Sequence, residues 1–336
     1  MGGTEGSLPD AARPQTRPPC AQIVAALILA RVPDPAETRR GLIVGTTAYL
    51  LWGAFPLYWP LLEPGGAVEI LAHRVVWSLI TMGLLVVVLS RRTLLRAILA
   101  DRRVTRLLLV AAVVISVNWG AFIYGVNSGR VVETSLGYFI NPLVTVMMGV
   151  LILGEKLRWL QWVALGIGAA AVAVLTWDYG RPPYVALALA FSFGTYGLAK
   201  KTAGVGAIES LAFETAVLAP VAAGYLVWLT VSGGSHFGSD GIGHALLLTS
   251  AGIVTAVPLI CFGFAATRVS MVSLGLLQYL APIMHFALGL LVFDEDMPVG
   301  RWVGFTLVWF ALALFTFELV RHRRRQLQLT VEAAAV

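Results

Sequence analysis

Three ionisable residues stand close together in one apolar stretch of the chain: Glu69, His73 and Arg74. Glu69 and His73 are four positions apart and share a helical face, whereas Arg74 is rotated from His73 by about 100°. A carboxylate beside an imidazole can carry a proton or meet a charged substrate, because histidine titrates near neutral pH. The alternative is an anchoring role, because a long arginine side chain can extend its charge to a nearby interface.

A separate carboxylate, Glu214, lies in another apolar stretch with no cation close to it in sequence. A buried carboxylate that gains and loses a proton can couple a conformational change to proton movement. The alternative is a structural pair between Glu214 and Lys200, Lys201 or a buried hydroxyl. Glu209 lies five residues earlier, where we expect it to be solvated at the end of the stretch.

Two similar segments, residues 135–142 and 273–282, both begin with Ser-Leu-Gly and end with a proline, Pro142 or Pro282. A proline inside a helix removes an amide donor and clashes with the carbonyl four residues back. Freed backbone groups in a membrane must face protein or water, so paired kinks indicate a central cavity; a plain packing kink is the alternative. The polar residues that we expect to line this cavity are Tyr138, Asn141, Gln278, Tyr279, Asn118 and His285.

The overall composition predicts an integral membrane protein, because 58% of the 336 residues are hydrophobic and only 12% are charged. Soluble domains usually contain about 25% charged residues, so the composition excludes that class. About 20 apolar residues cross the hydrocarbon core, and lipid offers the backbone no hydrogen-bond partner outside a helix. We expect an all-α integral membrane protein with ten transmembrane helices, near residues 42–62, 68–90, 106–127, 133–153, 158–177, 182–200, 207–231, 243–267, 270–293 and 299–320.

The placement of basic residues predicts how these helices are oriented. Most lysines and arginines fall in alternate connections and in both terminal segments, whereas the other connections hold only Arg130, Arg181 and Arg301. The positive-inside rule therefore places both termini in the cytoplasm. The net charge of +6 is explained by this asymmetry beside the lipid headgroups, so we expect the bilayer and no nucleic acid as a partner.

The echo between residues 135–142 and 273–282 extends along the chain and indicates a duplication. Five spans in each copy is an odd number, so the second copy enters the membrane from the opposite side, as in many secondary transporters. We expect two inverted five-helix repeats, at 41–178 and 179–320. Residues 1–40 are expected to form a disordered cytoplasmic tail, and 321–336 a basic cytoplasmic tail.

Sequence patterns for enzymatic chemistry are absent. The chain has no metalloprotease, serine hydrolase or phosphate-binding loop motif, so we expect no enzyme activity and no cofactor. Its two cysteines, Cys20 and Cys261, give no reason to infer a disulfide or a metal site. The oligomeric state stays open, with a homodimer as one option.

Several of these strings closely resemble RarD proteins, which belong to the EamA group of the drug/metabolite transporter superfamily. The resemblance covers about residues 40–322 and implies a bacterial inner-membrane permease with ten helices in a five-plus-five inverted repeat. The family's usual Gly-Glu after the ninth span reads Asp294-Glu295 here. The strings that carry the resemblance are residues 48–53, 69–78, 118–120, 135–142 and 275–279.

From the residues and the resemblance together, we expect a secondary transporter of small organic metabolites or drugs. Two halves that rock against each other would expose the central cavity to each side in turn, with export driven by protons or by exchange. The alternative from another class is a membrane sensor or assembly partner that transports nothing. A channel is disfavoured, because the sequence contains no ring of charge or filter-like loop.

Overall fold

The computed structural model describes residues 2, 35–153, 156–266, 268, 269, 273 and 276–335. Most of the predicted N-terminal tail lies outside these residues, as do Glu155 and parts of the 273–282 segment. The residues at the edges of the predicted repeats are helical: the first helix already begins at Pro35, and the last continues to Ala335. The basic segment after residue 320 therefore extends a helix.

The described residues form helices and no strands, as the composition predicts. Helical residues occur in each of the ten predicted segments, and one further helix, α5, occupies the basic stretch between two of them. The elements are α2 (Pro35–Gly53), α3 (Phe55–Tyr58), η1 (Trp59–Leu62), α4 (Ala67–Val88), α5 (Arg92–Ala100), α6 (Arg102–Asn127), α7 (Val131–Leu153), α8 (Trp159–Tyr179), α9 (Tyr184–Ala203), α10 (Ala207–Val231), α11 (Gly241–Ala266), α13 (Leu280–Leu291) and α14 (Val299–Ala335).

Seven of the described helices are long and apolar enough to cross a membrane. An eighth span results if the pair Ala36–Gly53 and Phe55–Leu62, bent by 43°, counts as one. Helix α9 is not among them, and α13 has only 12 residues. The all-helical membrane fold is therefore confirmed, whereas ten spans in two inverted repeats stay a prediction.

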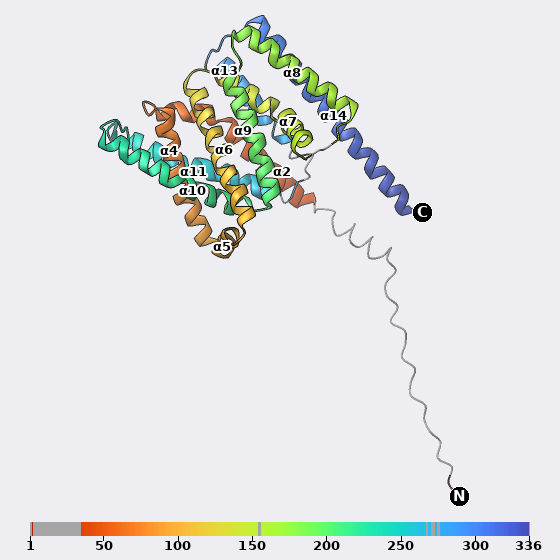
Figure 1. The fold of residues 1–336 in the computed structure, drawn as a ribbon, viewed down its shortest axis with the longest axis horizontal. Helices are drawn as coiled ribbons and strands as arrows, with labels where there is room; N and C mark the ends of the chain where they lie inside the picture. The colour runs from red at the N-terminus through yellow and green to blue at the C-terminus, as the bar shows by residue number, and fades with distance from the viewer. Residues whose placement is uncertain are drawn as a thin grey trace.

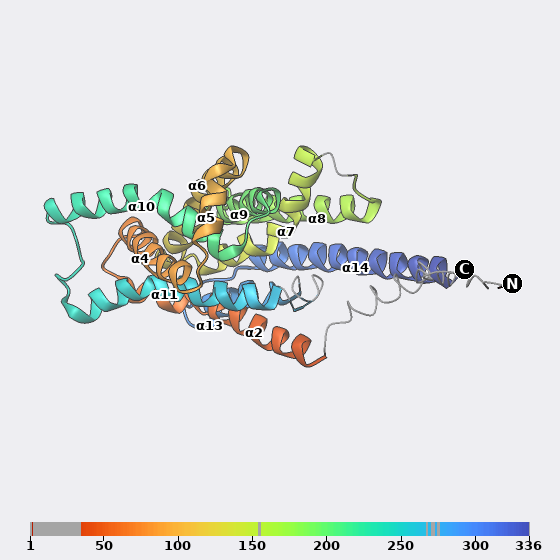
Figure 2. The same cartoon turned by 90° about the horizontal axis from the view of Figure 1, so that it is seen from below.

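The helices pack so that elements distant in sequence lie side by side. Figure 1 shows α8 lying along α14, and Figure 2 shows α4 between α10 and α11, in agreement with the contacts between these helices. Helix α2 packs against α11 and α13, and α9 packs against α6 and α7. The bundle thereby surrounds α4, α6 and α7 with helices from the second half of the chain.

Small residues allow these helices to approach closely. A Cβ atom added at Gly137 of α7 would lie 2.8 Å from the Ala186 carbonyl oxygen and 2.8 Å from Leu189 Cβ on α9. Lipid-embedded helices associate through such close packing rather than through a hydrophobic drive. The Ser-Leu-Gly string therefore brings the polar residues that follow it next to α9.

The two prolines occupy different positions. Pro142 lies inside α7, which continues as a helix on both sides of it. Pro282 lies in the first turn of α13. Backbone amides in the first turn of a helix have no intrahelical acceptor, so a proline there costs no hydrogen bond. The helical interruption in this segment falls at residues 278–279, before the proline, and not at Pro282 itself as the sequence suggests.

Candidate functional site

Arg74 lies in a cage of aromatic rings at the centre of the bundle, with only 4% of its surface exposed. Its Cζ atom is 4.1 Å from the ring centroid of Trp119, 4.9 Å from that of Trp59 and 5.7 Å from that of Phe55. Its Nε donates a hydrogen bond to Thr255 Oγ1 at 3.1 Å. Residues of α3, η1, α4, α6 and α11 therefore converge on one guanidinium group.

Arg74 is the one buried charged side chain in the described part of the chain that has neither an oppositely charged side chain nor an imidazole ion-pair partner within 4.0 Å. A buried charge is costly unless it is paired or hydrogen-bonded, and a desolvated cation–π contact returns about 2 kcal/mol. The cage thus stabilises a cation but leaves its charge uncompensated. Glu69 lies beside the imidazole of His236, and the buried carboxylates with an arginine or lysine partner are Glu133, Glu209, Glu214 and Glu318.

Three of the predicted cavity residues come together beside this cage. Asn118 is buried, and its amide nitrogen donates to Ser192 Oγ at 3.0 Å. Tyr138 donates its hydroxyl to Asn118 Oδ1 at 3.3 Å, and its ring centroid lies 5.8 Å from that of His285. His285 Nε2 is 3.0 Å from the Trp52 carbonyl oxygen. The polar centre therefore joins α6 and α7 of the first half to α9 and α13 of the second.

The other three predicted cavity residues do not join this centre. Asn141 accepts a hydrogen bond only from Thr145, at 3.5 Å, and Gln278 is exposed. Tyr279 is half-buried and hydrogen-bonds with Thr316 on α14. Because the helix is interrupted at residues 278–279, the helical spacing that would align these side chains with those of α13 does not apply.

The predicted pair of Glu69 and His73 does not form a hydrogen bond. Glu69 accepts instead from the backbone amide of His236 at 2.8 Å, and its other carboxylate oxygen is 2.7 Å from His236 Nδ1. His73 stacks on Phe237 with ring centroids 4.9 Å apart, and neither ring nitrogen has a partner among the described residues. The loop after α10 thus separates two side chains that share a helical face.

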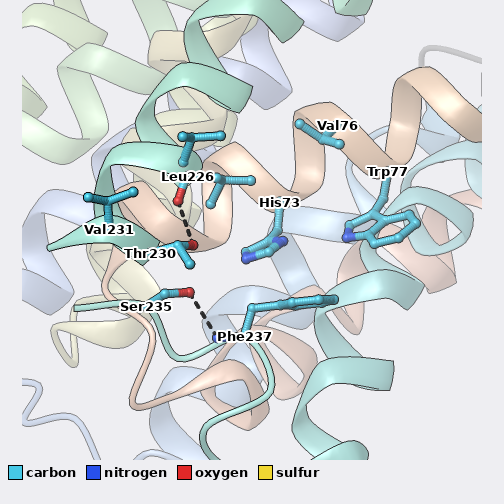
Figure 3. Close-up of a pocket in the computed structure, with 9 residues that line it drawn as sticks. His73, Val76, Trp77, Leu226, Thr230, Val231, Ser235 and Phe237 are labelled. Carbon is cyan, nitrogen blue, oxygen red and sulfur yellow. Dashed lines mark hydrogen bonds between the residues drawn. The ribbon is translucent and has the colours of Figure 1, made fainter. Parts of the chain in front are cut away.

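His73 faces a pocket of about 330 Å³ between α4 and the end of α10. Figure 3 shows the His73, Trp77 and Phe237 rings around it, with Leu226 and Val231 on the opposite wall. Val231 is 84% exposed, so the pocket opens at the outer surface of the bundle. Because adjacent helical residues point about 100° apart, this pocket is separate from the cage around Arg74.

Glu214 lies in a second charged centre, between α9 and α10, and has no exposed surface. Lys200 Nζ is 3.0 Å from Oε1 of Glu214, and the Tyr196 hydroxyl donates to Oε2 at 3.2 Å. The pairing with Lys200, the alternative left open by the sequence, is therefore present. The expectation that Glu209 is solvated is wrong: it is 5% exposed and lies 3.1 Å from Arg91 Nη1.

Glu295, in the loop between α13 and α14, caps the N-terminus of α7. Its carboxylate accepts hydrogen bonds from the backbone amides of Val131 and Val132, as carboxylates do at helix N-termini. Burial raises the pKa of Glu295 to about 7. This loop therefore contains a carboxyl group that titrates near neutral pH.

Some residues of these centres have only weak signals in the sequence. Thr255 is one of three hydroxyl residues in an apolar segment, beside Thr249 and Ser250, and Trp59 ends an aromatic-rich stretch. Tyr196 and Lys200 are four positions apart, which places the phenol and the ammonium on one face. That spacing could have identified the partner of Glu214, whereas nothing local links Thr255 to Arg74.

Comparisons with known proteins agree with the membrane fold. The sequence model of the EamA-like transporter family matches residues 39–177. The chain is 56% identical to Protein RarD of Streptomyces exfoliatus, over 89% of this chain and 95% of that protein. It is 40% identical to Protein RarD of Escherichia coli (strain K12), over 87% of this chain and 99% of that protein.

A third relative and one solved structure are also similar to this chain. The Uncharacterized transporter YojE of Bacillus subtilis (strain 168) is 42% identical, over 86% of this chain and 97% of that protein. A solved crystal structure aligns with a TM-score of 0.52 over 82% of this chain and 96% of its own, and at 18% identity this likeness concerns the fold alone. The chain therefore belongs to the RarD family of EamA-like membrane transporters, within the drug/metabolite transporter superfamily.

Proposed function

We propose that this protein is a secondary transporter that moves small organic metabolites or drugs across the bacterial inner membrane by alternating access. The observation that carries the proposal is the buried polar centre, where Arg74, Asn118 and Tyr138 of the first half meet Thr255 and His285 of the second. Binding sites of many secondary transporters lie between two halves in this way. A substrate held there contacts both halves at once.

The pairing of the helices supports an inverted repeat. If α2, α4, α6, α7 and α8 correspond in order to α9, α10, α11, α13 and α14, the contacts occur in matched sets. The contact of α2 with α11 corresponds to that of α9 with α6, and α2 with α13 to α9 with α7. The contact of α4 with α11 corresponds to that of α10 with α6, and the contacts of α4 with α10, α7 with α13 and α8 with α14 join corresponding helices. Such an arrangement allows the halves to rock about the central site.

Proton coupling belongs to the second charged centre in this proposal. Glu214 is held by a single lysine and a single phenol, with Lys200 Nζ at 3.0 Å. A conformational change that separates the pair leaves a carboxylate in an apolar environment, which favours its protonation. Movement of α9 against α10 would thereby exchange one proton in each cycle, and entry of that proton into the cell would drive export of the substrate.

Residues outside the polar centre complete the proposed path. Glu69 and His73 lie near one end of α4, Asn141 lies in the middle of α7, and Gln278 and Tyr279 form the break before α13. In a transporter that alternates between two states, such positions approach the substrate in the other state. The distribution of basic residues supports a cytoplasmic location for both termini, and a homodimer is compatible with this topology.

A flux measurement tests this function against that of a sensor or assembly partner. The purified protein is reconstituted into vesicles that contain a pH-sensitive dye, and amino acids, nucleosides and amphenicols are added one at a time. We expect at least one compound to cause proton movement that requires the wild-type protein. Glu214→Gln is expected to abolish proton movement while exchange of the same compound persists, and the absence of any compound-dependent flux would favour the sensor.

A further inference from the structure

We propose that the molecule recognised at the centre of this protein is an organic anion, with its anionic oxygens on Arg74 and an apolar group in the aromatic cage. This inference rests on the proposed transport function and names the class of substrate. It is carried by the environment of Arg74: the charge, the unused donors and the surrounding rings each point to the same chemistry.

The charge is the first step. Four buried glutamates each have an arginine or lysine within 4.0 Å, and Glu69 has a histidine, whereas Arg74, 4% exposed, has no carboxylate within that distance among the described residues. Charged residues inside a bundle usually pair with one another or mark a substrate path. A bound anion would supply the missing negative charge.

The unused donors are the second step. Only Nε of Arg74 donates a hydrogen bond to a described residue, so both Nη atoms are available to an acceptor. The indole nitrogen of Trp59 has no partner in the described chain, although Trp59 is completely buried and its ring lies 4.9 Å from the guanidinium. Ser78, one turn further along α4, is also completely buried, and its hydroxyl has no described partner. Guanidinium groups bind carboxylates and phosphates through paired hydrogen bonds, and these neighbours could donate further ones.

The shape of the surroundings is the third step. The rings of Trp119, Trp59 and Phe55 surround the guanidinium, and Phe122 lies 5.1 Å from His285 between centroids. Such walls favour an aromatic or aliphatic group attached directly to the anion. The buried carboxylates are already paired, so this centre offers no free negative charge for an amine. An anion therefore fits better than a zwitterion.

The experiment compares matched ligands that differ in charge alone. Phenylacetate, 3-phenylpropanoate and indole-3-acetate are each measured beside the corresponding primary amide, by thermal unfolding of the purified protein in detergent. We expect at least one carboxylate to stabilise the wild-type protein, with an affinity about tenfold or more above that of its amide. Arg74→Gln is expected to remove this preference, and Arg74→Lys to retain part of it, because a charge-assisted hydrogen bond is lost or weakened.

Two variants control for folding and location. Trp59→Phe keeps a smaller aromatic ring at this position and removes the indole N–H, so it is expected to weaken carboxylate binding while leaving the other rings of the cage in place. Arg301→Gln removes an arginine that is paired with Asp178 near the ends of α8 and α14, and it is expected to leave binding unchanged. If Arg74→Gln does not fold, the Trp59→Phe result decides.

The outcomes separate this inference from the transport function. Equal binding of acids and amides, no binding of either, or undiminished carboxylate binding by a folded Arg74→Gln protein would overturn the anion site. Vesicle uptake of a neutral compound alongside any of these results would leave the transport function standing. Carboxylate binding that depends on Arg74, without uptake in vesicles, would instead retain the site and contradict the transport function.

Discussion

Helices α4 and α10 pack against each other and contain similar short sequences, but the charged residue at the end of that sequence has opposite sign in the two helices. Residues 69–74 and 209–214 share glutamate at the first position, leucine at the third and alanine at the fourth. The sixth position is Arg74 in one and Glu214 in the other. The same helical framework thus presents a cation in one half and an anion in the other.

Glu69 and Glu209, the first residues of the two sequences and here called the outer glutamates, each form an interhelical pair. Glu69 pairs with His236 from the loop after α10, and Glu209 pairs with Arg91 from the segment after α4. Each helix therefore receives the partner of its outer glutamate from the end of the other helix. This reciprocity fits the proposed inverted repeat and does not depend on the inner charges.

The inner charges are held by matched positions with different chemistry. The alignment that pairs Trp52-Gly53 with Phe193-Gly194 also pairs Phe55 with Tyr196 and Trp59 with Lys200. Phe55 and Trp59 surround Arg74, whereas Tyr196 and Lys200 hold Glu214. The charge of Glu214 is balanced by Lys200, whereas Arg74 has no carboxylate within 4.0 Å among the described residues and is the proposed site of an anionic ligand. That difference suits coupling to one centre and substrate binding to the other.

The largest effect is expected when the ion pair between Lys200 of α9 and Glu214 of α10 is broken. Lys200→Met leaves Glu214 buried without a cation, which should lower the free energy of unfolding by about 3–5 kcal/mol. Arg74→Met leaves no carboxylate behind, so we expect a loss of less than about 2 kcal/mol from the cation–π contacts. Equilibrium unfolding in detergent measures both. Similar losses in the two variants would contradict the distinction between a paired and an unpaired centre.

A double variant tests the reason for that difference. Adding Glu214→Gln to Lys200→Met replaces the unpaired carboxylate by a neutral amide, so it should recover most of the lost stability. Glu214→Gln should not recover the stability lost in Arg74→Met, because Glu214 forms its ion pair with Lys200 and not with Arg74. Equal recovery in both backgrounds would indicate that the two centres are coupled.

The next effect in size comes from single hydroxyl groups. Tyr196→Phe removes one hydrogen bond to Glu214, and Thr255→Val removes one from Arg74, so each should cost about 1–2 kcal/mol. The two centres share no partner, so their losses should add within about 0.5 kcal/mol in the double variant. Unfolding of the four proteins in one detergent gives the test, and strong non-additivity would join the centres into one network.

The sequence predicts the membrane class and the identity of several central residues, because composition and apolar length are properties of single segments. It predicts Arg74, Asn118, Tyr138 and His285 from their polarity in apolar surroundings. It does not predict which of them meet. Arg74 meets Thr255 only because α4 packs against α11, and no periodicity in either segment contains that information.

Some predicted cavity residues lie apart from the polar centre for physical reasons. The sequence predicts Gln278 and Tyr279 beside a kink at Pro282, whereas the helical break falls at residues 278–279 themselves, so these two side chains do not follow the helical spacing of α13. Glu69 and His73 share a helical face, but His236 and Phe237 approach from a distant loop and bind them separately. In both cases a tertiary contact or a local break replaces the arrangement that regular spacing would give.

A smaller effect concerns the loop that caps α7. The pKa of Glu295 is raised by burial from 4.5 to about 7, so the folded protein binds the proton more tightly than the unfolded chain. The resulting stability is fully present below about pH 4.5 and is lost as the pH rises through about 7. Glu295→Gln should remove this part of the pH dependence of unfolding. An unchanged pH profile in the variant would contradict the assignment.

The smallest effect is expected from substitutions of Asp294, the residue before Glu295. The two halves of the chain differ at this position. The first half has Gly154 before Glu155, and the second has Asp294 before Glu295. Asp294 adopts a φ of 49°, a left-handed conformation that costs an L-residue about 1–2 kcal/mol and glycine little. Glycine loses about 0.5–1 kcal/mol of this advantage through the entropy of the unfolded chain.

Asp294→Gly should therefore stabilise the protein by about 0.5 kcal/mol, and Asp294→Ala should destabilise it, in thermal unfolding at fixed pH. Asp294→Asn removes the charge but tolerates the same backbone conformation, so it separates electrostatic from conformational effects. If Asn stabilises as much as Gly, the gain comes from removing a negative charge beside Glu295. A gain confined to Gly would indicate that the loop of the second half retains a backbone shape suited to the glycine of the first.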